Sequence, residues 1–250
     1  RRWVFYVNLI PGLLAAGFVA FASRDQLVSQ TQPSVDYAGA GLLMSAVVTL
    51  LLGLMNSKSS NGLLLIAASI ILFVLLLWVE SRAADPILPL HLFRERLFAV
   101  TIAHVTLTGW AMFGSISFVP LFVQAVLGTS ATRAGITIAP MLLGWVLSSI
   151  VGTRLLLRVG YRNLVMTGTI ALMIGAFFMS RIGVDTSQTS LMIFVALMGI
   201  GMGLSIPPFL IAVQTSVERR YLGTATSTMQ FSRSIGGTLG VSVMGAALSL

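Results

Sequence analysis

Residues 63–79 read LLLIAASIILFVLLLWV, a run without charge in which Ser69 is the only polar side chain. An α-helix needs roughly 17–25 apolar residues to cross the hydrocarbon core of a bilayer. A helix that is apolar on all sides can face lipid around most of its circumference. These residues are therefore predicted to form a transmembrane helix.

Seven further apolar stretches of similar length fill the rest of the chain, and the gaps between them hold nearly every charge. The stretches occupy residues 4–22, 39–55, 98–127, 134–157, 163–180, 190–215 and 223–250. The pattern predicts an all-α, polytopic membrane helix bundle with eight spans. A chain with so many spans is more typical of a transporter than of a tethered protein.

The composition supports the same class and argues against several others. Hydrophobic residues make up 56% of the chain and charged residues 9%, against about 25% charged in soluble proteins. The absence of cysteine excludes disulfides and thiolate metal sites. His91 and His104 have no partners at metal-ligand spacing. We therefore expect no metal and no cofactor, and the lack of clustered acids and histidines in the gaps argues against an enzyme.

The net charge of +8 follows membrane topology rather than a nucleic-acid surface. If the gaps alternate sides, one side holds nine Lys and Arg residues and the other five. Because cytoplasmic loops carry the excess of Lys and Arg, the arginine-rich gaps are predicted to be cytoplasmic. These are residues 23–38, 81–97, 158–162 and 216–222, and the gaps at 56–62, 128–133 and 181–189 are then external. No basic run with interleaved aromatic residues supports nucleic-acid binding.

The last five stretches are rich in Gly, Ala, Ser and Thr, which let helices pack closely in a membrane. The spacings of Gly199 with Gly203 and of Gly236 with Gly240 fit a G-x-x-x-G packing face. The final stretch is barely hydrophobic enough to insert alone, so we expect neighbouring helices to shield it. Prolines inside the spans remove backbone hydrogen bonds, which indicates either packing kinks or a part in gating. They are Pro120, Pro140, Pro207 and Pro208.

Several segments resemble one family in both motif and order. RRWVFYVNLIPGLL (1–14) resembles a W-R-W-x-F-x-x-N-x-P-x-G signature, and the run from Asp36 to Gly39 resembles D-x-x-G. ESRAADPILPLHLF (80–93) resembles a cytoplasmic linker. Pro120 to Gln124, followed by Ala134, Gly135 and Pro140, resembles a P-x-x-x-Q … a-G … P pattern. Arg233 to Gly240 resembles R-x-x-G-G-x-x-G. These signatures are typical of the fourteen-span drug:proton antiporters of the major facilitator superfamily, the EmrB/QacA type.

The resemblance implies that the chain corresponds to spans six to thirteen of fourteen. Residues 1–22 would be the last span of the N-terminal bundle, residues 23–97 two linker spans with a cytoplasmic linker, and residues 98–250 an incomplete C-terminal bundle. Two positions depart from the pattern. Ile10 and Pro11 stand in reversed order, and Leu157 replaces the acid of a D-R-x-G-R loop, which puts a salt bridge there in doubt.

The resemblance also implies a function. A protein of this family would lie in the inner (cell) membrane among lipid and export hydrophobic or amphipathic small molecules (multidrug efflux) in exchange for protons, by alternating access. Where the source has two membranes, some relatives work with a periplasmic adaptor and an outer channel. The alternatives are a transporter of this superfamily for another solute class, a membrane-integral enzyme and a non-transporting scaffold.

No acidic residue lies in mid-membrane, although proton-driven export commonly relies on a buried carboxylate. The proton-titrating acid is therefore expected in the N-terminal half that the resemblance implies. His104 lies near the start of its span, where a helix-end hydrogen bond is favoured over a proton relay.

Ten residues are candidates for transport. Arg233 is the one charge well inside a span, so it should face the bundle or an aqueous cavity, or else snorkel to the headgroups. The candidates for the substrate cavity are Gln124, Trp110, Phe118 and Gln230, each of which could instead serve packing. The candidates for gating or coupling are Arg233, Arg158, Gly160, Arg162, Pro207 and Pro208.

Overall fold

The computed structural model describes residues 3–22, 36–56, 59–83, 86–88 and 90–248. The chain divides into two compact units, residues 1–35 and residues 36–250. In the first unit the described element is one helix, α1 (Trp3–Ala22), which contains Pro11.

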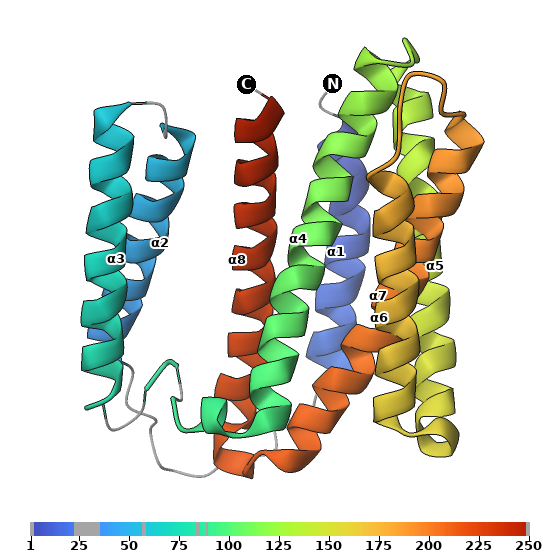
Figure 1. The fold of residues 1–250 in the computed structure, drawn as a ribbon. Helices are drawn as coiled ribbons and strands as arrows, with labels where there is room; N and C mark the ends of the chain where they lie inside the picture. The colour runs from blue at the N-terminus through green and yellow to red at the C-terminus, as the bar shows by residue number, and fades with distance from the viewer. Residues whose placement is uncertain (1–2, 23–35, 57–58, 84–85, 89, 249–250) are drawn as a thin grey trace. The chain divides into compact units, whose positions relative to one another are not determined.

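The second unit is built of seven α-helices and two short 3-10 helices within the described residues, and these contain no strand (Figure 1). The elements are α2 (Tyr37–Met55), α3 (Ser60–Glu80), η1 (Leu92–Arg94), α4 (Arg96–Ala125), α5 (Ala131–Val159), α6 (Tyr161–Met179), α7 (Gln188–Ser216), η2 (Arg219–Tyr221) and α8 (Leu222–Leu248). The prediction of an all-α membrane helix bundle is confirmed.

Six helices, α2 to α7, are long and apolar enough to cross a membrane. The final helix, α8, is long but less apolar: among its residues are Arg233 and many Gly, Ser and Thr. In α1 the apolar run that can be described is shorter, from Leu9 to Phe21. The expectation that the last span needs shielding agrees with this, because α8 packs along α4 and also touches α2 and α7.

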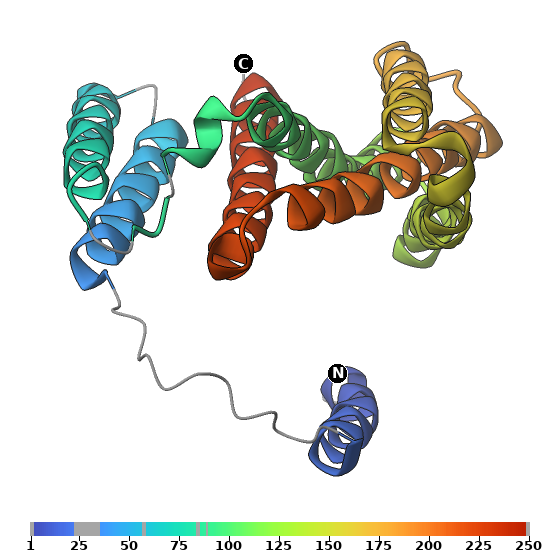
Figure 2. The same cartoon turned by 90° about the horizontal axis from the view of Figure 1, so that it is seen from below.

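The helices of this unit pack in three groups, which both views show side by side (Figures 1 and 2). The helices α2 and α3 form an antiparallel hairpin, α4 pairs with α8, and α5, α6 and α7 form a third group. Contacts of α7 with α5 and α6, of α4 with α8 and of α2 with α3 are extensive, whereas those between groups are sparser. This division leaves room between α4, α8 and the third group.

Glycines on α7 bring its backbone against both neighbours of the third group. A Cβ on Gly199 would collide with the carbonyl of Met141 on α5, and one on Gly203 with Ser148 and Trp145. Gly201 faces the other way, where a Cβ would lie 2.5 Å from the carbonyl oxygen of Gly168 on α6. The predicted packing face of Gly199 and Gly203 is therefore confirmed. Gly201 adds a second face that the G-x-x-x-G spacing did not predict.

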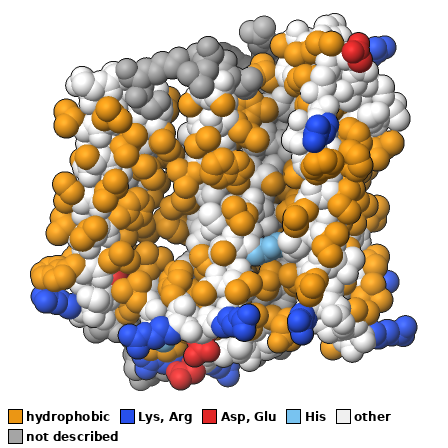
Figure 3. All heavy atoms as spheres, in the orientation of Figure 1, with side chains coloured by type: hydrophobic (Ala, Val, Ile, Leu, Met, Phe, Trp, Pro, Cys, Tyr) orange, Lys and Arg blue, Asp and Glu red, His pale blue; other side chains and the backbone are white. Residues whose placement is uncertain are grey.

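Arginines gather at one end of the second unit. At that end α3, α5 and α7 finish and α4, α6 and α8 begin (Figure 1). The space-filling view shows most of the visible Lys and Arg side chains at this end and fewer at the other (Figure 3). The arrangement is the up-and-down order that the alternating gaps predicted.

Single cysteines placed at opposite ends should be labelled from opposite sides of the membrane. These 250 residues contain no cysteine, so Asp185→Cys and Arg162→Cys are introduced into the full-length protein after any cysteine elsewhere in it has been replaced. We expect a membrane-impermeant maleimide to reach Cys at 185 from outside intact cells, and to reach Cys at 162 only after permeabilisation. Labelling of both positions from the same side would contradict the orientation drawn from the arginines.

Candidate substrate cavity

An apolar cavity of about 560 Å³ lies between the α4–α8 pair and the third helix group. Most of its wall comes from the C-terminal half of α4, and the rest from α6 and its end, α7 and α8. The lining residues are Trp110, Ala111, Gly114, Ser115, Phe118, Val119, Leu121, Phe122, Ala125, Val126, Ala176, Met179, Ser180, Ile182, Met198 and Met244. Its volume lies in the range of sites for drug-sized molecules.

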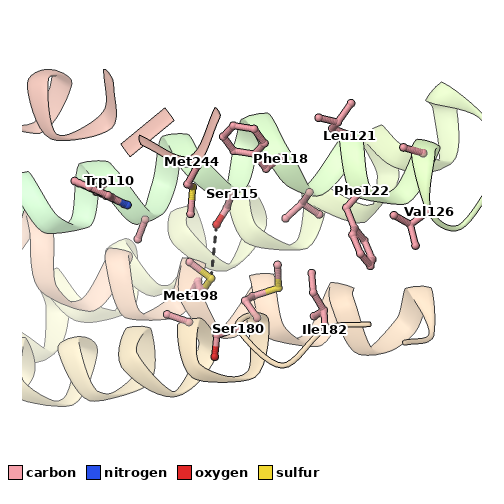
Figure 4. A pocket seen from close by; sticks show the side chains of 16 residues that line it. Trp110, Ser115, Phe118, Leu121, Phe122, Val126, Ser180, Ile182, Met198 and Met244 are labelled. Carbon is pink, nitrogen blue, oxygen red and sulfur yellow. Dashed lines mark hydrogen bonds between the residues drawn. The ribbon is translucent and has the colours of Figure 1, made fainter. Parts of the chain in front are cut away.

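The wall carries aromatic rings and methionine sulfurs. Trp110, Phe118 and Phe122 come from α4, and Met198 and Met244 face them from α7 and α8 (Figure 4). Aromatic rings offer flat apolar surface, and methionine is flexible enough to fit ligands of differing shape. A wall of this kind suits apolar or amphipathic molecules that vary in shape.

The two serines of the wall already have partners. Ser115 Oγ lies 3.8 Å from Met198 Sδ, the dashed contact in Figure 4, and Ser180 Oγ donates to the carbonyl of Phe177 at 2.7 Å. Among the described residues that line the cavity there is no charged side chain. The described wall therefore offers apolar contact and no charge.

The glycine-rich motif of α8 positions the α4 side of this wall. A Cβ on Gly240 would lie 2.7 Å from Trp110 Cγ, and one on Gly237 would overlap the Phe113 ring. Gly236 brings α8 against the Thr106 carbonyl, and on α4 Gly109 lies against the backbone of Arg233. Close approach of α8 to α4 thus depends on the R-x-x-G-G-x-x-G run, and it fixes the place of Trp110.

Two of the four predicted cavity residues line this cavity, and they are Trp110 and Phe118. Gln124 is exposed on α4, where its Nε2 donates to the carbonyl of Pro120 at 3.2 Å. Gln230 is exposed on α8. Neither glutamine belongs to the lining of this cavity.

Arg233 lies roughly three turns into α8. It is partly buried, and its backbone packs against Gly109 of α4. Among the residues that the structure describes, no carboxylate pairs with its guanidinium. A charge at this depth must reach water or a polar partner, because an Arg in mid-membrane costs roughly 2.5–3.5 kcal/mol on insertion scales.

Arg158, Gly160 and Arg162 form the turn between α5 and α6. Gly160 ends α5 and starts α6 with φ of +78°, a backbone conformation that favours glycine. Both arginines are exposed, and so is Leu157, at 94%. Within the described ranges neither arginine has an ion-pair partner. The turn therefore owes its local geometry to the glycine.

Pro207 and Pro208 lie inside α7, which continues through them as a helix. Pro208 is buried, whereas Pro207 lines a second cavity of about 370 Å³ together with residues of α5. Those residues are Ser149, Ile150, Thr153 and Arg154. Likewise, α4 and α5 continue through Pro120 and Pro140.

His104 lies deeper in the helix contacts than its place near the start of the span suggested. Its Nδ1 is 3.5 Å from Thr169 Oγ1 on α6, and its ring centroid is 4.9 Å from that of Phe209 on α7. Its Nε2 is buried and has no hydrogen-bond partner among the described residues. The histidine therefore connects α4 to the third helix group.

Comparison with known proteins assigns the family. The model of the Major Facilitator Superfamily matches residues 2–241, which is nearly the whole chain. This chain belongs to the major facilitator superfamily. Its relatives are membrane transporters rather than enzymes, in keeping with the multi-pass helix bundle.

Curated relatives of this superfamily protein include named drug and efflux transporters. It is 36% identical over 99% of its length to "Multidrug transporter protein MdtP" of Bacillus subtilis (strain 168), covering 47% of that protein. It is 34% identical over 98% of its length to "Multidrug resistance protein 3" of the same organism, covering 49%. "Aspyridones efflux protein" of Neocamarosporium betae is 28% identical over 99% of the chain, with 47% of that protein covered. The chain thus spans about half the length of these relatives.

The residues of the cavity that sequence patterns missed come from α4, α6, α7 and α8. Met198 and Met244 belong to α7 and α8, and Ser115 to α4. Their types alone predict packing. The one signal in the sequence was the glycine run of α8, which predicted close contact with a neighbour but did not say which one.

Gly240→Ala should displace Trp110 and loosen the α4–α8 contact. An added methyl group that overlaps a packed neighbour costs about 1–3 kcal/mol, so we expect a lower unfolding temperature of the detergent-purified full-length protein. The matched control is Gly245→Ala on the same helix, where the nearest atom, Phe118 Cζ, is 3.9 Å from the new Cβ. Equal stability of the two variants would contradict the inference that Trp110 packs directly against Gly240.

Proposed function

We propose that this protein forms about half of a secondary active transporter that exports apolar or amphipathic small molecules of varied structure. The observation that carries the proposal is the cavity between α4, α7 and α8, whose wall combines aromatic rings and methionines and whose described lining has no charge. The names of the relatives in Bacillus subtilis point to the same kind of cargo.

The cavity lies toward the end of the unit opposite to the arginine-rich end, since its lining runs to Val126 at the end of α4 and to Ile182 beyond α6. With the arginines on the cytoplasmic side, this is the external half of the membrane. Export needs a site that opens outward in one state and inward in another. The sparse contacts between helix groups, together with Pro207 and Pro208 in α7, favour rearrangement at this boundary.

Exchange for protons is part of the proposal, and so is a place in the cell (inner) membrane. No acidic side chain of the described residues lies in the middle of a spanning helix. The coupling acid is therefore assigned to the remaining half of the transporter. A periplasmic adaptor with an outer channel stays a further prediction that depends on the source of the chain.

The function is tested by transport in proteoliposomes that contain the full-length protein. An imposed pH gradient should drive uptake or release of an amphipathic fluorescent dye, and dye movement should in turn move protons. Trp110→Ala should weaken dye binding about fivefold, because an aromatic contact contributes on the order of 1 kcal/mol. Trp78→Ala on α3, where the tryptophan is 54% exposed, is the matched control. Dye movement that ignores the gradient would refute proton exchange, and equal affinity of both variants would remove Trp110 from the site.

Arg233→Ala should abolish export while membrane abundance stays normal. The reason is that a charge kept roughly three turns deep in α8 costs energy to insert and is expected to serve the transport cycle. Transport and abundance are measured on the same cells, with Arg96→Ala at the start of α4 as the control for loss of a positive charge. Wild-type export by the Arg233 variant would take this residue out of the mechanism.

A further inference from the structure

Two carboxylates meet at the arginine-rich end of the α2–α3 hairpin. Asp36 precedes the first residue of α2, and Glu80 is the last residue of α3. The two helices run antiparallel, so these positions lie at the same end (Figure 1). Glu80 is only 3% exposed, which is rare for an acid without a cationic partner.

Each carboxylate uses one oxygen in a backbone hydrogen bond. Asp36 Oδ1 accepts from the Gly39 amide at 2.7 Å and caps α2. Glu80 Oε2 accepts from the Leu88 amide at 3.2 Å, which ties the segment after α3 back to the hairpin. The second oxygens, Asp36 Oδ2 and Glu80 Oε1, are buried and have no partner among the described residues.

These two free oxygens face the same small space beside Gly39. A Cβ on Gly39 would lie 2.5 Å from Asp36 Oδ2 and 2.8 Å from Glu80 Oε1. The D-x-x-G run therefore has a second structural role besides capping α2. The glycine leaves the room in which the two carboxylates approach each other.

The surroundings offer no cation to this pair in the part of the chain that can be described. Asp36 is the charged group that faces Glu80 across Gly39. Arg82 is the nearest in sequence, but its guanidinium stacks over the Trp78 ring at 4.1 Å. Helix α8, which touches α2, carries only Arg233, and Tyr37 beside Asp36 is 80% exposed.

We propose that Asp36 and Glu80 form a carboxyl pair that binds one proton and closes the arginine-rich end of the α2–α3 hairpin. Two neighbouring carboxylates cannot both ionise at low cost, and one shared proton removes the repulsion. An O–H on one carboxyl, donated to the facing oxygen of the other, satisfies both free oxygens at once. A metal ion would need more ligands, and no group of three or more acidic, His or Cys side chains surrounds this point among the described residues.

The bound proton ties three segments together: the start of α2, the end of α3 and the chain that leads into α4 through Leu88. Loss of the proton would place two negative charges side by side in a buried position and push these segments apart. The pair is outside the substrate cavity and differs from the coupling acid of the transport cycle. It is a separate proton site, in the linker hairpin, that responds to pH at the arginine-rich end.

The protonated carboxyl is detectable by infrared spectroscopy of the full-length protein in detergent. We expect the C=O band of a protonated carboxylic acid at neutral pH, lost when the pH is raised. The coupling acid of the remaining half can give a band of its own, so the pair is read from the difference between the wild-type and variant spectra. Part of the wild-type band should be missing in Glu80→Gln and also in Asp36→Asn, since each removes one member of the pair. Glu218→Gln, which changes an exposed glutamate, is the matched control and should keep the full band. The full wild-type band in both pair variants, or no band in the wild type, would overturn the proposal.

Thermal unfolding against pH gives an independent readout. A proton held only by the folded pair stabilises the protein at low pH, and this contribution is lost as the pH rises through the titration of the pair. The unfolding temperature of the wild type should fall over that range, while that of Glu80→Gln and Asp36→Asn should fall less. Stabilisation by sodium over choline at constant pH, abolished in either variant, would show a metal cation instead and overturn the proton assignment. Neither measurement involves transport, so failure of the proposed export leaves this test intact.

Discussion

The absence of water from the hydrocarbon core is the constraint behind the rest of this structure. Every backbone N–H and C=O in the membrane must find a partner inside the chain, which leaves helices as the form that a single segment can take. Once helices have formed, apolar side chains gain little by leaving lipid for each other. Their association then depends on close packing and on hydrogen bonds between helices.

Glycine supplies that close packing in the second unit, along two seams besides the contact of Gly201 with α6. Gly199 and Gly203 bring α7 against α5, and the run from Gly236 to Gly240 brings α8 against α4. Between the two seams the contacts are fewer, and the apolar cavity lies there. The same contacts that hold each seam thus determine where the space between them lies and which side chains line it.

Trp110 belongs both to the contact between α4 and α8 and to the wall of the cavity. The Trp110 ring packs against Gly240 of α8, and Trp110 also lines the cavity. A substitution in α8 would therefore alter the cavity wall through Trp110 as well as through Met244. The described charges lie at the helix ends, with Arg233 as the exception, and the buried Glu80 and the partly exposed Asp36 face each other at such an end rather than in mid-membrane.

The sequence by itself determined the helices and their order. The apolar run at 63–79 lies inside α3 (Ser60–Glu80), and the run at 98–127 nearly coincides with α4 (Arg96–Ala125), because length and hydropathy are properties of each segment alone. The rotation of each helix was decided only by the tertiary structure, since segments that are apolar all round carry almost no periodic signal. For this reason Trp110 lines the cavity and Gln124 does not, although both are candidates on α4. The approach of Asp36 to Glu80 across the hairpin is likewise a tertiary contact, which no spacing in the sequence reveals.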